Sequence, residues 1–170
     1  KGHRTVAFLR NNESDYDRRS GYVILFRESL LAHAKELGMT VIESEHYEAD
    51  SFDAQHFVST VFAHPDRPTA IINQANASVL SQVLMALHDA GMSIPQDVSV
   101  LSCGTYFEGE PTRFPITEMP VMPEELCAEA MNLLVSAIEE HTDIKGSVEL
   151  IEPALKRRRS VAEAGSGGTI

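Results

Sequence analysis

The sequence lacks tryptophan, contains only two cysteines and has no long hydrophobic run. Two cysteines cannot build a disulfide framework, so we expect a protein from a reducing compartment, with both thiols in apolar surroundings. No apolar stretch approaches the roughly 20 residues of a membrane-spanning helix. The first residues, Lys1 to Arg4, lead directly into a strand-like run and do not resemble a secretory signal. These absences favour a cytoplasmic protein with no membrane partner.

Basic residues are also scarce, since 14 Lys and Arg stand against 25 Asp and Glu and the formal net charge is −11. A strongly negative chain is not attracted to a phosphate backbone, so we do not expect these 170 residues to bind DNA by themselves. The basic run Lys156 to Arg159 is typical of a solvated strand. The length and the hydrophobic content of 43% suffice for one globular domain with a core.

The stretch from Arg67 to Cys103 has the pattern of a βαβ unit. A short apolar run is followed by the amides of Asn73 to Asn76, and apolar residues then recur at helical spacing: Val79, Leu80, Val83, Leu84 and Leu87. Gly91 ends this helix, and Val98 to Leu101 is predicted to be the next strand. In open parallel sheets ligands sit at the carboxyl ends of the strands, which makes Asn76 a candidate ligand residue.

Other elements extend this alternation into a doubly wound α/β fold with a parallel sheet. We predict strands at 5–9, 40–42, 70–72, 98–101, 147–151 and 155–161, helices at 22–37, 52–62, 77–90 and 123–139, a polar loop at 11–17 and a flexible tail at 162–170. Ser51 or Asp50 is expected to cap the second helix, and Pro123 suits the start of the last one. That last helix has an apolar side formed by Leu126, Ala130, Met131, Leu133, Leu134 and Ile138.

The chain resembles the effector-binding core of LacI/GalR-type transcription regulators over about residues 2 to 161. The segments that carry the resemblance are Gly2 to Leu9, Arg18 to Tyr22, Arg67 to Asn76, Leu84 to Val100, Ile116 to Val121 and Pro123 to Leu126. The resemblance implies one lobe of a type I periplasmic-binding-protein-like fold plus a crossover helix. It divides the chain into a carboxyl lobe (1–117), a crossover and helix that normally pack on an amino lobe (118–146), terminal strands that return to the carboxyl lobe (147–161) and the tail (162–170).

Candidate site residues follow from this resemblance. Arg18 stands where the family places its ligand arginine, and the alternative is a solvated arginine. Ser14 stands where the family often places a hydroxyl in the cleft, and the alternative is an ordinary loop serine. Asn76 matches the family's ligand asparagine, and the alternative is the cap of the following helix. Further candidates are Arg27, Gly104, Thr105 and Val121. The acids that the family usually carries are replaced by Ala77 and Gly104, so the resemblance does not imply a simple pyranose ligand.

The resemblance implies a regulator that couples a small, sugar-like effector to DNA binding, and not an enzyme. The DNA would be bound by an amino-terminal domain that precedes these residues in the family. Self-association is expected through Val79, Val83 and Phe107, and the apolar side of the last helix would pack on this lobe or on a second copy. The alternatives are a periplasmic-type sugar-binding transport protein of the same fold and a small flavodoxin-like enzyme. No histidine pattern suggests a metal site, and no motif suggests a cofactor.

Overall fold

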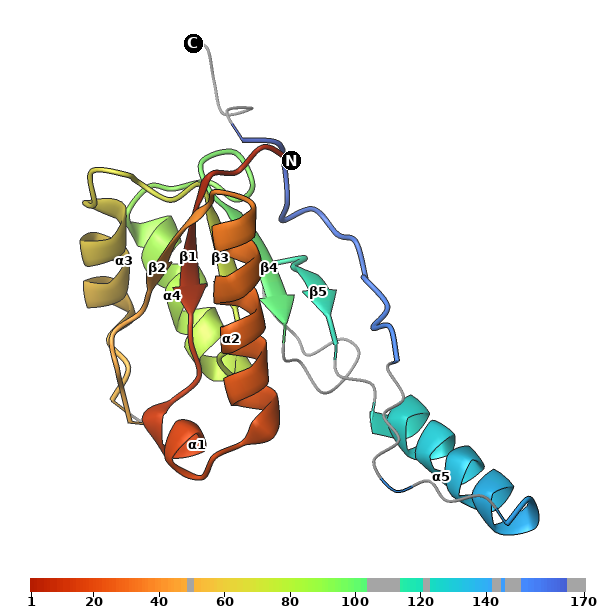
Figure 1. The fold of residues 1–170 in the computed structure, drawn as a ribbon. Helices are drawn as coiled ribbons and strands as arrows, with labels where there is room; N and C mark the ends of the chain where they lie inside the picture. Colours follow the sequence, from red (N-terminus) through yellow and green to blue (C-terminus); the bar gives the residue numbers. More distant parts are fainter. Residues whose placement is uncertain (49–50, 104–113, 121–122, 142–144, 146–150, 165–170) are drawn as a thin grey trace.

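A computed structural model describes residues 1–48, 51–103, 114–120, 123–141, 145 and 151–164. Five strands form one sheet in the order β2-β1-β3-β4-β5, and every pairing is parallel. The elements are β1 (Thr5–Leu9), α1 (Glu13–Asp17), α2 (Gly21–Glu36), β2 (Thr40–Glu43), α3 (Ala54–Phe62), β3 (Ala70–Asn73), α4 (Ala77–Asp89), β4 (Ser99–Cys103), β5 (Thr117–Met119) and α5 (Pro123–Glu139). The predicted doubly wound parallel sheet is confirmed (Figure 1).

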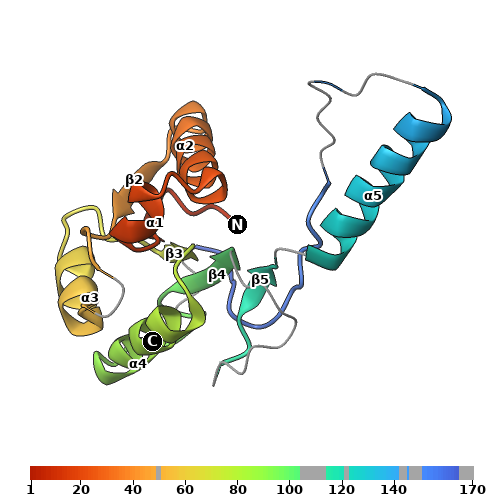
Figure 2. The ribbon, with the colours of Figure 1, turned by 90° about the horizontal axis from the view of Figure 1, so that it is seen from below.

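Helices cover both faces of the sheet, α2 on one face and α3 with α4 on the other (Figure 2). The main core lies on the α3–α4 face, because Ala7, Leu9, Ile71 and Val100 point there and pack against the buried sides of the two helices. Alternate strand residues face α2, and the ring of Phe8 stacks on Phe26 of α2 at 6.0 Å between centroids.

The helix ends follow local signals, with one correction. Gly38 and Gly91 have φ angles of 63° and 73°, the left-handed conformation for which glycine is suited after a helix. The cap of α3 is Asp53, whose side chain accepts a hydrogen bond from the His56 backbone N–H at 2.9 Å, so the prediction of Ser51 or Asp50 was wrong. The reason is that Phe52 precedes the helix and packs its ring against Tyr47.

The segment 11–17, predicted as a polar loop, contains the short helix α1. Asn12 caps it, since its side-chain oxygen accepts from the Asp15 backbone N–H at 3.2 Å and from the Ser14 hydroxyl at 2.6 Å. Five residues are too few for a hydrophobic period, so only the cap could have indicated this helix.

The terminal segment, residues 151–164, runs beside β4 and β5 but forms no regular strand, which corrects the prediction for 155–161. Its one β-bridge joins Lys156 to Glu118. Elsewhere backbone hydrogen bonds are isolated, such as that from the Val100 N–H to the Ser160 carbonyl at 2.7 Å, and side chains supply others: the Ser160 hydroxyl donates to the Val100 carbonyl at 2.6 Å and accepts from the Thr117 N–H at 2.7 Å. The predicted strand 147–151 lies outside the described residues except for Ile151, which is irregular.

Helix α5 begins at Pro123 as predicted, and beyond its first turn it extends away from the sheet (Figure 1). Glu125 and Leu126 line a cavity of about 230 Å³ together with Tyr22 and Met119. Farther along, the apolar side chains are exposed, up to 63% for Ile138. Within the described residues, the apolar side of α5 does not pack on this lobe.

None of the helices in the described ranges is both long enough and apolar enough to cross a membrane.

Polar network at the carboxyl ends of the strands

Polar side chains gather where β1 and β3 end. Arg10 follows β1, Asn73 ends β3, and Gln74 comes next in the chain. All three are buried, and the backbone N–H of Gln74 donates to the Leu9 carbonyl at 2.9 Å, which holds the two strand ends together. This is the edge at which parallel α/β sheets bind ligands.

Arg10 is only 5% exposed and is surrounded by partners. Its guanidinium lies 4.2 Å from the centroid of the Tyr16 ring and 3.4 Å from a carboxylate oxygen of Glu13. Its backbone N–H donates to the Ser44 hydroxyl at 3.2 Å, and its carbonyl accepts from the Tyr47 hydroxyl at 3.0 Å. Arg10 therefore fixes the position of α1 over the end of β1.

A chain of hydrogen bonds connects α1 to β3 and α2. The Tyr16 hydroxyl donates to Gln74 Oε1 at 3.3 Å, and Gln74 Nε2 donates to the Val23 carbonyl at 3.2 Å. Burial raises the pKa of Tyr16 above its ordinary value, against the opposing charge of Arg10, so the phenol stays protonated and can donate. Asn73 Nδ2 donates to the Ala75 carbonyl and to the Ser102 hydroxyl, both at 3.0 Å.

Two buried atoms of this network, Arg10 Nε and Asn73 Oδ1, have no hydrogen-bond partner within the described residues. A buried polar atom left unpaired costs about 1–3 kcal/mol, so such atoms are stabilised by any hydroxyl group that reaches them.

Ser14 lies in α1, and Arg18 is the residue at its carboxyl-terminal cap. The Ser14 hydroxyl donates to Asn12 Oδ1 at 2.6 Å and thus supports the cap, which is the structural alternative for this residue. The Arg18 side chain is exposed and forms no hydrogen bond or ion pair with any described residue. This cap position is two residues after Tyr16.

Asn76 is exposed and caps α4, its side-chain oxygen accepting from the Val79 N–H at 3.0 Å. Its amide nitrogen remains available, because a cap uses only the oxygen. Asn76 follows Gln74 by two residues, and the Tyr16–Gln74 hydrogen bond joins α1 to the loop between β3 and α4 that contains both.

Arg27 is not available as an alternative ligand arginine in this structure. Its guanidinium forms two hydrogen bonds to the Glu43 carboxylate, at 2.6 and 2.8 Å. This hydrogen bonding raises the pKa of Arg27 and joins α2 to β2. The candidates Gly104, Thr105 and Val121 lie outside the described residues, as does Phe107.

The predicted self-association residues of α4 require a correction. Val79 and Val83 are 2% and 0% exposed and belong to the main core, so they cannot contact a second copy. The exposed apolar residue of α4 is Met85.

The two cysteines differ, which corrects the expectation that both lie in apolar surroundings. Cys127 is exposed on α5, and Cys103 is buried at the end of β4. Burial raises the pKa of Cys103 from 9.0 to about 12.

We expect Cys103 to react far more slowly than Cys127 with a thiol reagent at pH 8. A shift of three pKa units lowers its thiolate fraction about 1,000-fold, before burial adds a steric barrier. Mass spectrometry during iodoacetamide labelling, with Cys127→Ser as the control, measures both rates; equal rates would contradict the burial of Cys103. Because the folded state favours the protonated Cys103 thiol, its raised pKa adds to the free energy of unfolding. This contribution is complete below pH 9 and is lost as the pH rises toward 12.

The groups left available for a ligand are the Arg18 guanidinium and the Asn76 amide nitrogen, and both can donate hydrogen bonds to hydroxyl groups. Among the described residues no group of three His, Cys, Asp or Glu side chains could hold a metal ion. Arg10, Tyr16 and Gln74 were missed as site residues by sequence reasoning. The usable signal was that Arg10 and Gln74 directly follow β1 and β3, and that Tyr16 lies in the predicted polar segment 11–17.

Comparison with known proteins identifies the relationship. The family model of the periplasmic-binding-protein-like domain matches residues 1–161, whereas no curated protein has significant sequence similarity to the chain. Solved structures with the same fold include a LacI family transcriptional regulator from Bifidobacterium animalis subsp. lactis, with 24% identity over 95% of this chain and a TM-score of 0.68. A LacI-family transcriptional regulatory protein from Corynebacterium glutamicum has 18% identity over 95% of this chain and a TM-score of 0.67.

A third similar structure is a LacI family transcriptional regulator from Arthrobacter in complex with lactose, with 19% identity over 94% of this chain and a TM-score of 0.65. The chain covers 56%, 60% and 57% of these three proteins, respectively, and so spans little more than half of their length. Because the family model covers nearly all of the sequence, this chain belongs to the periplasmic-binding-protein-like domain family.

Proposed function

We propose that the chain is the effector-binding lobe of a LacI-family transcription regulator, and that it binds a small ligand rich in hydroxyl groups. The observation that supports this most strongly is the buried polar network at the carboxyl ends of β1 and β3. In the proposed site the buried Arg10 and Asn73 hold the edge in shape, while the exposed Arg18, at the end of α1, and the exposed Asn76, at the start of α4, contact the ligand.

The nature of the similar proteins supports a regulator over a transport protein, since the three described above are transcriptional regulators and one holds lactose. In the proposed mechanism the ligand binds differently to an open and a closed cleft between this lobe and a second one. That difference shifts the population of the two states and thereby changes DNA binding. Contact with DNA, self-association, and cytoplasmic location remain parts of the proposal.

In the proposed site Arg18 donates several hydrogen bonds to the ligand, and the Asn76 amide nitrogen donates one while its oxygen keeps the helix cap. Arg10 is a positioning residue, because its guanidinium is occupied by Glu13 and Tyr16. Ser14 supports the Asn12 cap and is not needed as a ligand contact.

The proposal is tested by titrating the chain with lactose and with a panel of monosaccharides, with binding measured as a saturable rise in melting temperature. We expect at least one sugar to bind, and Arg18→Ala to weaken it by about tenfold or more, as the loss of a charge-assisted hydrogen bond does. Asn76→Ser retains a capping oxygen and removes the amide nitrogen, so it should weaken binding without lowering stability.

Arg4→Ala is the matched control, because Arg4 is an exposed arginine before the opposite end of β1. Equal sugar affinity in the wild type, Arg18→Ala and Asn76→Ser would remove both residues from the site. No binding of any sugar would count against sugar sensing by this chain.

A further inference from the structure

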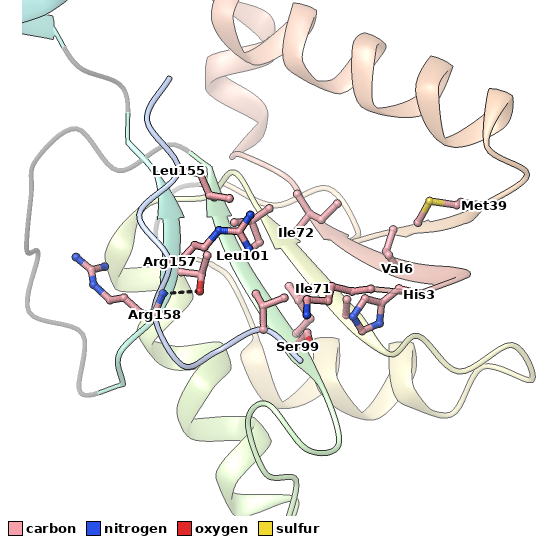
Figure 3. Close-up of a pocket in the computed structure, with 14 residues that line it drawn as sticks. His3, Val6, Met39, Ile71, Ile72, Ser99, Leu101, Leu155, Arg157 and Arg158 are labelled. Carbon is pink, nitrogen blue, oxygen red and sulfur yellow. Dashed lines mark hydrogen bonds between the residues drawn. The ribbon is translucent and has the colours of Figure 1, made fainter. Parts of the chain in front are cut away.

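A second hollow lies on the α2 face of the sheet, toward the amino ends of the strands. It is a cavity of about 460 Å³ between the sheet, the end of α2 and the terminal segment (Figure 3). Ala70, Ser99 and Thr117, each the first residue of its strand, line it. The cavity is therefore separate from the polar network at the carboxyl ends.

The cavity has an apolar floor, and its walls carry apolar, polar and basic side chains. Val6 of β1, Ile72 of β3 and Leu101 of β4 form the floor. Met39, just after α2, and Leu155, in the terminal segment, flank it. Its volume is within the range of small-molecule sites, which is about 300–1,000 Å³. An apolar ligand would remove this surface from water, which is the main source of affinity in such a site.

The polar groups of the wall are already engaged. The His3 ring lies between the Thr69 hydroxyl at 2.8 Å and the Ala162 carbonyl at 3.1 Å. The Ser99 hydroxyl accepts from the Ala162 N–H at 3.0 Å, and the Thr117 hydroxyl accepts from the Arg158 N–H at 3.0 Å. Among the described residues, no buried side-chain atom without a hydrogen-bond partner lines this cavity, so it does not suit a sugar.

Arg157 contributes a positive charge to the cavity. Figure 3 shows Leu155 and Arg157 reaching from the terminal segment over the strands that carry Ile72 and Leu101. The neighbouring Arg158 is paired with Glu118 at 2.6 Å, whereas Arg157 forms no hydrogen bond or ion pair with any described residue. A guanidinium beside apolar surface matches a carboxylate that carries an apolar body.

We propose that this cavity binds a small amphipathic carboxylate, with the aliphatic chain on the floor of Val6, Ile72 and Leu101 and the carboxylate on Arg157. The inference is independent of the proposed sugar site, because the two sites share no residue and lie at opposite ends of the strands. The ligand would bind by contacts alone, without chemical change.

Octanoate is a suitable probe, titrated into the full chain by calorimetry. Acetate supplies the charge without the chain, and octan-1-ol supplies the chain without the charge. We expect octanoate to bind with a single saturable site, acetate not to bind measurably, and Arg157→Gln to weaken octanoate at least tenfold while leaving octan-1-ol unchanged. Leu155→Gln, at an exposed position of the wall, should weaken both long-chain probes.

Arg159→Gln is the matched control, since Arg159 is an exposed arginine of the same segment that does not line this cavity. Circular dichroism verifies that each variant folds, and Arg157→Lys, which keeps a charge, should restore part of the affinity. The proposal would be overturned if the wild type and Arg157→Gln bound octanoate equally well. It would also be overturned if acetate bound as tightly as octanoate. Equal weakening by Arg157→Gln and Arg159→Gln would also overturn it, because it would indicate attraction to the basic segment in general.

Discussion

Replacing Leu87 by alanine is expected to lower the free energy of unfolding by about 3 kcal/mol, within the range of buried leucine truncations. Leu87 is 0% exposed on the inner side of α4 and belongs to the core between α3, α4 and the sheet. The substitution removes buried apolar surface and leaves a cavity that the close-packed strands can fill only in part. Urea denaturation monitored by far-ultraviolet circular dichroism measures the change.

Met85→Ala is the control for Leu87→Ala, because Met85 lies on the same helix and is 56% exposed. Its effect should stay within about 0.5 kcal/mol. If the two variants were equally destabilised, α4 would not bury the side that the structure assigns to the core.

The second large effect is expected for Arg10→Met, which should lower the free energy of unfolding by about 2–3 kcal/mol, because the substitution breaks a largely buried charge pair. Methionine keeps an apolar stem against Tyr16 but leaves the Glu13 carboxylate without its arginine. The loss should be measurable as a lower urea midpoint with an unchanged slope.

Arg18→Met, eight residues along the chain, is the control for Arg10→Met. Arg18 is exposed, so its removal should change stability by less than about 0.5 kcal/mol. The two arginines thus separate positioning from ligand binding: Arg10→Met should affect folding, and Arg18→Ala should affect sugar affinity. A stable Arg10→Met variant would show that the Arg10–Glu13 pair is not needed to hold α1 in place.

The fold could be predicted from the sequence where several local signals agreed. The unit β3–α4–β4 combines an apolar run, a capping asparagine at Asn76, a helical apolar period and the terminating Gly91, and each points to the same structure. Helix α1 and the terminal segment could not be predicted in this way. The first is too short to show a period, and the second combines isolated backbone hydrogen bonds with bonds through side chains such as Ser160, which a pattern of hydrophobicity does not report.

The sequence indicated individual candidate residues for the site but not the hydrogen bonds that connect the side chains around it. Arg18, Ser14 and Asn76 came from a family resemblance; the structure places the first two in α1 and its cap and the third at the cap of α4, and their contact with a ligand stays a prediction. The hydrogen bond between Tyr16 and Gln74 joins residues 58 apart in sequence, and such a pairing depends on the whole sheet. Val79 and Val83 were misassigned to a surface, although their helical spacing with Leu87 already placed them on the buried side of α4.

The terminal segment also has a consequence for the order of folding during synthesis. β1, β2, β3 and β4 can pair as soon as residue 103 is available, since these pairings need nothing beyond β4. The start of β4 depends on a segment that is synthesised later, because the Val100 N–H donates to the Ser160 carbonyl at 2.7 Å. A nascent chain would therefore leave the start of β4 without this partner while some sixty further residues are translated, whereas β5 covers the rest of the strand earlier. During that interval this part of the sheet edge is exposed to pairing with other chains, a period in which a chaperone would be of use.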